Sequence, residues 1–178
     1  MRVPVLFLSG LLFASAVRAT DPSTAIGPVE MPGIQNFGRV TPTLYRGGDF
    51  MPKGIQSLVD LGVRTVISLR SHVRHAERDS CASHGIAHYS FPMDSDTTPD
   101  AAAMDSVLDI IRNAKAPVYV HCSAGEIRTG TVCALYRIRV HGWSPKRAWA
   151  EQEAYGFGAR ESHPHLFYFV YGDGSALK

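Results

Sequence analysis

A cysteine and an arginine separated by five residues stand in the most reactive-looking part of the sequence. Residues 121–130 read His-Cys-Ser-Ala-Gly-Glu-Ile-Arg-Thr-Gly, with Cys122 and Arg128 at the two key positions. The short apolar run Val118–Val120 precedes this segment and a helical pattern follows it, which predicts a loop between a strand and a helix. A thiol and a guanidinium in such a loop suit nucleophilic attack on a bound anion.

The loop is expected to bind a phosphate group. Where a loop enters a helix, consecutive backbone N–H groups turn inward, and the helix N-terminus adds about half a positive charge. Gly125 lets the backbone curl without a Cβ clash, and Arg128 can donate two parallel hydrogen bonds to phosphate oxygens. The residues predicted to bind the phosphate are Ser123, Ala124, Gly125, Glu126, Ile127 and Arg128.

Cys122 is the predicted nucleophile. The positive field that holds phosphate also stabilises a thiolate, so the pKa of Cys122 is expected to fall well below the free value of about 8.5. A thiolate under a bound phosphorus atom is placed for in-line attack. His121 is expected to order the loop by hydrogen bonding, and Thr129 to place a hydroxyl beside the sulfur. A buried structural thiol, the commoner fate of a cysteine, would leave the rest of the loop unexplained.

The pattern His-Cys-x-x-Gly-x-x-Arg-Thr-Gly resembles the signature of the protein tyrosine and dual-specificity phosphatases. Over roughly residues 36–160 the chain resembles their small bacterial, plant and fungal dual-specificity-like members. The resemblance implies a phosphomonoester hydrolase with a phospho-cysteine intermediate, no metal or other cofactor, and a phosphorylated protein or small phosphate ester as substrate. The outer matches are Asn36-Phe37, Leu44–Gly48, Gly62–Arg70 and Ala134–Arg137.

The family also uses an aspartate, about 30 residues before the cysteine, as a general acid. The leaving oxygen must be protonated, and a positioned acid contributes roughly 10²–10⁴ in rate. Asp94 is the first candidate and Asp96 the second, with Asp100 behind them. The family pattern would place the acid near Ser95, one position from either candidate. Because aspartate is also a common turn residue, the assignment stays open.

Strands and helices alternate along the chain. This alternation predicts one α/β domain with a mainly parallel central sheet flanked by helices, as in the cysteine phosphatases. Ligands bind outside the carboxyl ends of strands in such sheets, and Val118–Val120 leads directly into the cysteine loop. The expected strands cover 44–46, 63–69, 86–91 and 118–120. The expected helices cover 52–61, 75–84, a segment from 99 past 111, 129–141, 144–155 and 163–171.

Residues 1–19 have the composition of a secretory signal peptide. Arg2 gives a positive start, Val3–Ala16 is mostly apolar, and small residues end at Ala19. The apolar run is shorter than the ~20 residues of a spanning helix. We therefore expect an exported protein, periplasmic or secreted from a bacterium, without a stable membrane anchor after cleavage. Residues 20–35 are expected to be a flexible lead-in, and residues 36–178 the phosphatase domain.

The composition suits a globular protein and gives no support for nucleic-acid binding. Of 178 residues, 45% are hydrophobic and 19% charged. The leader holds two arginines and no acidic residue, so its removal leaves 16 basic and 16 acidic residues. A chain with no net charge has no general basic field for a nucleic acid.

Other residues leave alternatives open. Three cysteines leave at least one thiol unpaired, so a disulfide between Cys81 and Cys133, or a reversible one to Cys122, stays open in an oxidising compartment. Arg46 is either a substrate contact or a salt-bridged structural residue. Four histidines, without a full set of metal ligands, are expected to be solvated rather than metal-bound: His72, His75, His84 and His88.

Two other classes of function remain to be distinguished from a phosphatase. A pseudophosphatase would bind phosphate without turnover. A sulfurtransferase or arsenate reductase also combines a cysteine loop with an arginine, but the five-residue spacer and its late position disfavour both. Among phosphatases, one for small-molecule or inositol phosphates is an alternative, although the acidic Glu126 disfavours polyanionic substrates by like-charge repulsion.

Overall fold

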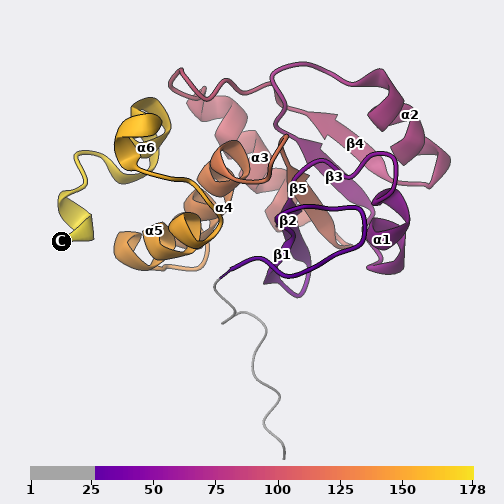
Figure 1. Cartoon of the computed structure of the whole chain (residues 1–178), viewed down its shortest axis with the longest axis horizontal. Helices are drawn as coiled ribbons and strands as arrows, with labels where there is room; N and C mark the ends of the chain where they lie inside the picture. Colours follow the sequence, from indigo (N-terminus) through magenta and orange to yellow (C-terminus); the bar gives the residue numbers. More distant parts are fainter. Residues whose placement is uncertain (1–26) are drawn as a thin grey trace, which may run out of the picture.

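The computed structural model describes residues 27–178, which fold around a five-stranded sheet (Figure 1). The spatial order is β1-β2-β5-β3-β4, with β2, β5, β3 and β4 parallel and β1 antiparallel to β2. The mainly parallel sheet expected from the sequence is confirmed, whereas the predicted signal peptide lies outside the described residues. The strands are β1 Gly38–Thr41, β2 Leu44–Gly47, β3 Thr65–Ser68, β4 Ala87–Ser90 and β5 Val118–His121.

Residues 27–178 also contain six α-helices and two short 3-10 helices. The Asp100 side chain caps α3 by accepting from the Ala103 N–H, and Ser144 caps α5 in front of Pro145. None of the helices in residues 27–178 is long and apolar enough to cross a membrane. The helices are α1 Ile55–Asp60, α2 His75–Ser83, α3 Ala101–Asn113, α4 Ile127–Arg139, α5 Pro145–Ala154, α6 Pro164–Tyr171, η2 Arg160–Ser162 and η3 Ser175–Leu177.

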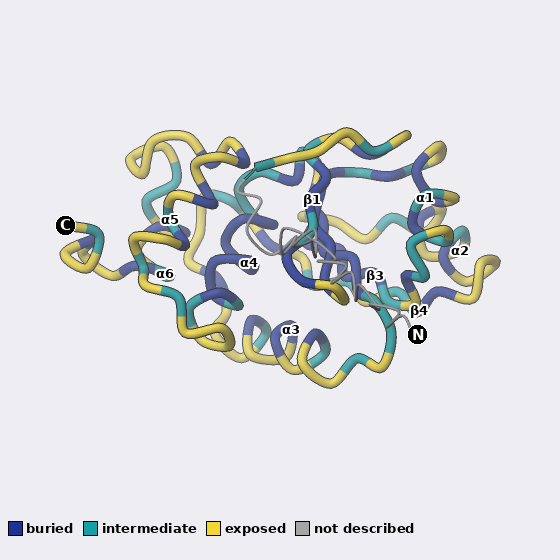
Figure 2. Tube along the Cα trace, turned by 90° about the horizontal axis from the view of Figure 1, so that it is seen from below, coloured by how far each residue is buried: buried dark blue, intermediate teal, exposed yellow. Residues whose placement is uncertain are grey.

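The two faces of the sheet bury different clusters. On β5, Val118 and Val120 pack with α3 and α4, whereas Tyr119 packs on the other face with α1 and α2. Figure 1 shows the same division, with α1 and α2 on one side of the strands and α3 to α6 on the other. The buried segments in Figure 2 run through the sheet and along α4. A period of two along each strand therefore decides which helix a side chain meets.

The parallel strands end in register at one edge of the sheet. Gly47 at the end of β2 and Ser68 at the end of β3 both pair with His121, the last residue of β5. Because the chain continues from His121 into the cysteine loop, the loop lies between the carboxyl ends of three neighbouring strands. This is the edge at which open α/β sheets bind ligands.

Three features differ from the sequence-based expectations. The edge strand β1 was not expected, and its antiparallel pairing follows from a short turn before β2. The packed part of the chain begins before residue 36, since Ile34 is 5% exposed and bridges Met31 within the expected lead-in. Helix α4 begins at Ile127 rather than at residue 129, which places Arg128 in its first turn.

Candidate active site

Cys122 directly follows β5 and is buried, with 2% of its surface exposed. Four residues separate it from the first residue of α4, Ile127. Within residues 27–178, the backbone N–H groups from Ser123 to Arg128 donate to no protein oxygen. A run of unpaired N–H groups at the start of a 13-residue helix can receive an oxyanion.

Neighbouring strands hold the cysteine loop from several directions. The Asp49 N–H donates to the Ser123 carbonyl oxygen at 2.8 Å, and the Leu69 N–H donates to the His121 carbonyl oxygen at 2.8 Å. Gly125 has φ +77°, and a Cβ there would lie 2.3 Å from the carbonyl carbon of Gly47. The loop conformation therefore requires glycine at this position, both for its dihedral angle and for its contact with β2.

Arg128 turns back toward the loop that precedes it. Its Nη2 donates to Ser123 Oγ at 3.3 Å, and its Nη1 donates to the carbonyl oxygens of Leu69 and Met93, both at 3.3 Å. Leu69 follows β3 and Met93 follows β4, so the guanidinium lies across the carboxyl edge of the sheet. These contacts set the direction of the fork and bring it to the residue next to Cys122.

Thr129 and Gly130 fix α4 against its neighbours. The Thr129 side chain is buried, and its hydroxyl donates to the Gly47 carbonyl oxygen at 3.4 Å. The sequence predicted this hydroxyl beside the sulfur, whereas its observed hydrogen bond joins α4 to β2. A Cβ at Gly130 would lie 3.0 Å from Gln152 Cγ, so the glycine permits close packing of α5 on α4.

His121 hydrogen-bonds on both sides of its ring. Its Nδ1 lies 3.1 Å from the Cys122 carbonyl oxygen, and its Nε2 lies 3.0 Å from Glu77 Oε1. His88 Nε2 approaches the same oxygen of Glu77 at 2.8 Å. The expectation that His88 is solvated is therefore wrong: its side chain is 4% exposed. His72, His75 and His84 are exposed, as expected.

Glu77 is a buried carboxylate that the sequence did not single out. Burial opposes its charge, but hydrogen bonds from His121 and His88 outweigh burial and hold the pKa of Glu77 well below its ordinary value. The helical spacing could have indicated that Glu77 faces inward, because it stands one turn before the apolar Cys81 on the inner face of α2. Its partner across 44 residues could not be read from that pattern.

The other two cysteines are buried and unreactive in character. Burial, with a smaller contribution from Glu77, raises the pKa of Cys81 to about 12. Burial also raises the pKa of Cys133 to about 11. All three thiols are free, and Cys81 and Cys133 belong to clusters on opposite faces of the sheet. The disulfide left open by the sequence is not formed in this structure.

Both candidate general acids lie in a segment that touches Arg128. Met93, whose carbonyl oxygen accepts from Arg128, directly precedes Asp94. Asp94 is exposed, and its Oδ1 accepts from the Asp96 N–H at 3.0 Å. Asp96 is exposed as well. The segment is thus held at the edge of the cysteine loop by its contact with Arg128, while both carboxylates face solvent.

Arg46 is structural rather than solvent-facing. It is 1% exposed, its guanidinium lies 3.7 Å from the centre of the Tyr155 ring, and its Nη2 donates to the Gly125 carbonyl oxygen at 3.0 Å. Within the described part of the chain, its Nε and Nη1 have no hydrogen-bond partner. Of the two roles left open by the sequence, the structure favours support of the loop, without the expected salt bridge.

Asp49 gathers two further arginines beside the loop. Its Oδ2 accepts from Arg70 at 3.1 Å and also from Arg74, while its own N–H holds Ser123. Arg70 follows β3 and Arg74 precedes α2. This cluster could not be predicted from the sequence, because its members come from two separate segments.

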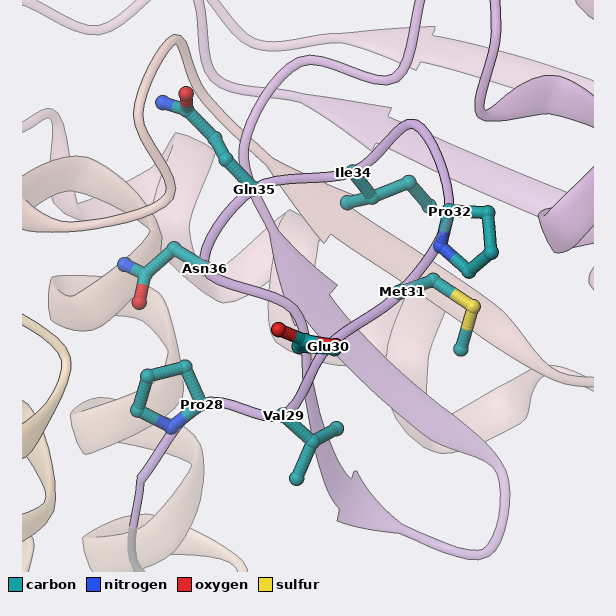
Figure 3. Close-up of a pocket in the computed structure, with 8 residues that line it drawn as sticks. All are labelled: Pro28, Val29, Glu30, Met31, Pro32, Ile34, Gln35 and Asn36. Carbon is teal, nitrogen blue, oxygen red and sulfur yellow. The ribbon is translucent and has the colours of Figure 1, made fainter.

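A pocket of about 490 Å³ lies along the N-terminal segment (Figure 3). Figure 3 shows its lining, which comes from residues 28–32 and 34–36 and includes Gln35 and Asn36. None of the catalytic residues predicted from the sequence lines this pocket. The candidate site is therefore assigned from the geometry of the cysteine loop and not from the size of this cavity.

Comparison with known proteins agrees with this geometry. Residues 45–163 match the family model of the Swiss Army Knife DSP-PTPase phosphatase domain. The dual specificity protein phosphatase TpbA of Pseudomonas aeruginosa is 32% identical over 171 residues, covering 93% of this chain and 75% of TpbA. Mouse dual specificity protein phosphatase 2 is 29% identical over 133 residues, covering 68% of this chain and 36% of that protein.

Solved structures show the same relationship. The crystal structure of P. aeruginosa TpbA superposes with a TM-score of 0.71 at 31% identity, covering 87% of this chain and 96% of that one. The yeast phosphatase SIW14 shares the fold at 21% identity, with a TM-score of 0.68 and coverage of 84% and 91%. The chain belongs to the DSP-PTPase family of cysteine-dependent dual-specificity and tyrosine phosphatases.

Proposed function

We propose that this phosphatase is exported and hydrolyses phosphotyrosine in proteins, with Cys122 as the nucleophile. The observation that carries the assignment of the site is the position of Arg128, which reaches from the first turn of α4 to Ser123, the neighbour of Cys122. Nucleophile, guanidinium and unpaired N–H groups then share one site. That combination fits a tetrahedral dianion bonded to carbon through oxygen.

Substrate binding uses the loop and the arginine together. The N–H groups of residues 123–128 take the non-bridging phosphate oxygens, and Arg128 adds its planar fork. Its contacts with Leu69 and Met93 hold the fork in place before substrate arrives. Because the donors are already oriented, little reorganisation is needed when charge shifts in the transition state.

The first chemical step transfers the phosphoryl group to sulfur. The Cys122 thiolate attacks phosphorus in line, an S–P bond forms, and the bond between phosphorus and the ester oxygen breaks. The leaving oxygen takes a proton from the general acid, for which Asp94 and Asp96 are the candidates in the segment beside Arg128. The products of this step are the free hydroxyl compound and the phospho-cysteine.

The second step returns the enzyme to its starting form. A water molecule gives a proton to the same carboxylate, and the oxygen of this water attacks phosphorus. The S–P bond breaks, sulfur leaves as a thiolate, and inorganic phosphate departs. The positive end of α4 stabilises the thiolate as a leaving group in this step.

A phosphotyrosine substrate is supported by one relative. TpbA, at 31% identity, has been crystallised in complex with phosphotyrosine, with a TM-score of 0.66 to this chain and coverage of 90% and 91%. The acidic Glu126 also supports a substrate with a single phosphate, since an acidic residue in the loop repels additional phosphates. Export is proposed from the signal-like composition of residues 1–19.

The deciding experiment compares substrates on the mature protein. Hydrolysis of a phosphotyrosine peptide, a phosphoserine peptide and inositol phosphates is measured side by side, with Cys122→Ser as the inactive variant and Cys81→Ser as the matched control. We expect the phosphotyrosine peptide to give the highest kcat/KM, Cys122→Ser to lose turnover but still bind phosphate, and vanadate to inhibit the enzyme. Normal turnover by Cys122→Ser would refute the role of Cys122.

The remaining outcomes decide between the alternatives. A burst of product without steady turnover would identify a phosphate-binding pseudophosphatase, and preferred hydrolysis of inositol phosphates would identify a small-molecule phosphatase. Cell fractionation of the full-length chain tests export separately. Mature protein found in the cytoplasm would remove that part of the proposal.

A further inference from the structure

We infer that Glu77 is a positioning residue that holds His121 as an imidazolium directly behind the nucleophile, an inference that rests on the proposed role of Cys122. Three buried side chains form this group: Glu77 on α2, His121 at the end of β5 and His88 on β4. The side chains of Glu77 and His121 are 0% exposed. These three residues lie outside the cysteine loop, but His121 hydrogen-bonds to the carbonyl oxygen of Cys122.

The hydrogen bonds determine where the protons lie. A carbonyl oxygen can only accept, so Nδ1 of His121 must carry the proton that it shares with the Cys122 carbonyl oxygen, 3.1 Å away. On the other side of the ring, Nε2 faces Glu77 Oε1 at 3.0 Å. That oxygen also lies 2.8 Å from His88 Nε2, and an ionised oxygen accepts from two rings more strongly than a carboxyl oxygen that must donate to one of them.

An ionised Glu77 satisfies all of these contacts at once. The carboxylate then accepts from both histidines, and His121 donates from both of its nitrogens, which requires the imidazolium form. The depressed pKa of Glu77 agrees with this arrangement, because burial alone would favour the neutral acid. Its second oxygen, Oε2, has no partner among the described residues, so Oε1 carries the interaction.

The pair places its positive end toward the cysteine. His121 is joined through its own backbone to Cys122, whereas Glu77 lies on the far side of the ring. A cation hydrogen-bonded to the backbone of Cys122, with an anion behind it, favours the thiolate, and it does so without exposing a charge to solvent. The adjacent His121 and Cys122 in the sequence do not reveal this arrangement, since Glu77 supplies the negative charge that keeps the His121 ring protonated.

Three groups that pack around the His121–Glu77 pair, Tyr119, Cys81 and Phe50, do not supply a competing charge. Tyr119 stacks on the His121 ring at 5.6 Å between centroids, and burial raises the pKa of Tyr119 well above its ordinary value. On α2, the pKa of Cys81 is raised to about 12, first by burial and then by Glu77. Both groups are therefore neutral near pH 7. Phe50 meets the His121 ring edge-on at 5.2 Å and carries no charge.

The test measures ionisation of Cys122 and does not require hydrolysis. Alkylation of Cys122 by iodoacetamide is followed against pH, with mass spectrometry to locate the label, in the wild type, in Glu77→Gln and in Glu151→Gln. Glu151 is the matched control because it is a buried glutamate paired with Arg137, away from the loop. We expect Glu77→Gln to slow alkylation at pH 6 about tenfold, with no change at high pH, because the thiolate is the form that reacts with iodoacetamide.

The control separates this role from general destabilisation. Glu151→Gln should lower the melting temperature yet keep the wild-type alkylation profile. A folded Glu77→Gln protein with that same profile would overturn the inference. If Glu77→Gln does not fold, the ring of His121 is observed in the wild type by nitrogen NMR: two protonated ring nitrogens at pH 7 support the inference, and one bare nitrogen refutes it. A wild type that alkylates as expected but hydrolyses nothing would instead refute the proposed function.

Discussion

Arg46 donates from Nη2 to the Gly125 carbonyl oxygen at 3.0 Å, from the side of the loop that faces the protein interior. The arginine is 1% exposed and its Nε and Nη1 lack partners within the described residues. A buried cation with unpaired donors costs stability. Arg46 lies under the loop that is proposed to bind a dianion. Its positive charge would stabilise the occupied site, which explains why a destabilising buried cation is present there.

Replacing Arg46 by methionine should therefore separate stability from binding. Methionine keeps the length of the side chain and removes the unpaired donors, so we expect little change in melting temperature. The positive charge under the loop is lost, so the inhibition constant of vanadate should rise about tenfold, which corresponds to about 1.4 kcal/mol of binding free energy. Thermal unfolding and vanadate inhibition measure the two effects.

Arg137→Met is the control for this prediction. Arg137 is also buried, but its guanidinium is paired with Glu151 at 2.7 Å. Breaking a buried ion pair leaves an uncompensated charge and costs about 3–5 kcal/mol. Arg137→Met should thus unfold at lower temperature than Arg46→Met while binding vanadate normally when folded. Unchanged vanadate binding in Arg46→Met would contradict the role assigned to Arg46.

Gly125→Ala tests how strictly the loop conformation is required. The φ of +77° disfavours a side chain by about 1–2 kcal/mol, and the new Cβ would lie 2.3 Å from the Gly47 carbonyl carbon. Gly62→Ala is the matched variant, since Gly62 has φ +73° and no atom within 4 Å of the added Cβ. We expect Gly125→Ala to lose both stability and phosphate binding, and Gly62→Ala to lose stability alone. Equal activity in the two variants would contradict this.

Much of the fold follows from local sequence pattern, and the reason is visible on β5. Val118 and Val120 face one helix layer and Tyr119 the other, so an uninterrupted apolar run predicts a strand that is buried on both faces. The glycine and arginine spacing in the loop predicts a phosphate site for equally local reasons. The edge strand β1 was not predicted, because its four residues show no strong alternation of apolar and polar side chains. They form a strand by pairing with β2 across a short turn.

The rest of the site depends on distances in space that no spacing encodes. Glu77 meets His121 only because α2 packs on the face of the sheet that also carries Tyr119. The expectation that His88 is solvated failed for the same reason, since its partner lies on α2. The Thr129 hydroxyl donates to the Gly47 carbonyl oxygen on β2, a contact across 82 residues that the spacing does not predict. Such contacts are fixed by packing and not by local sequence.

Asp94→Asn and Asp96→Asn should identify the general acid. The residue that protonates the leaving oxygen matters most for poor leaving groups, so its variant should lose about 10²–10⁴ in kcat on a phosphotyrosine peptide. The same variant should lose much less on an aryl phosphate with an acidic phenol. Asp100→Asn is the control, because Asp100 caps α3 through the Ala103 N–H. Equal losses on both substrates would indicate disturbance of the loop instead of a missing acid.

Glu77 should also shape the dependence of stability on pH. Its pKa in the folded protein lies well below the ordinary value of 4.5, so the folded state holds this proton less tightly than the unfolded state. The stabilisation is therefore fully present above about pH 5 and is lost as the pH falls below 4.5 toward the folded-state pKa. In Glu77→Gln this part of the acid-induced loss should disappear, so urea unfolding midpoints at pH 5 and pH 3 should lie closer together than in the wild type. Glu153→Gln, at an exposed glutamate, should keep the wild-type difference. A wild-type difference in Glu77→Gln as well would mean that the buried carboxylate is not ionised in the folded protein.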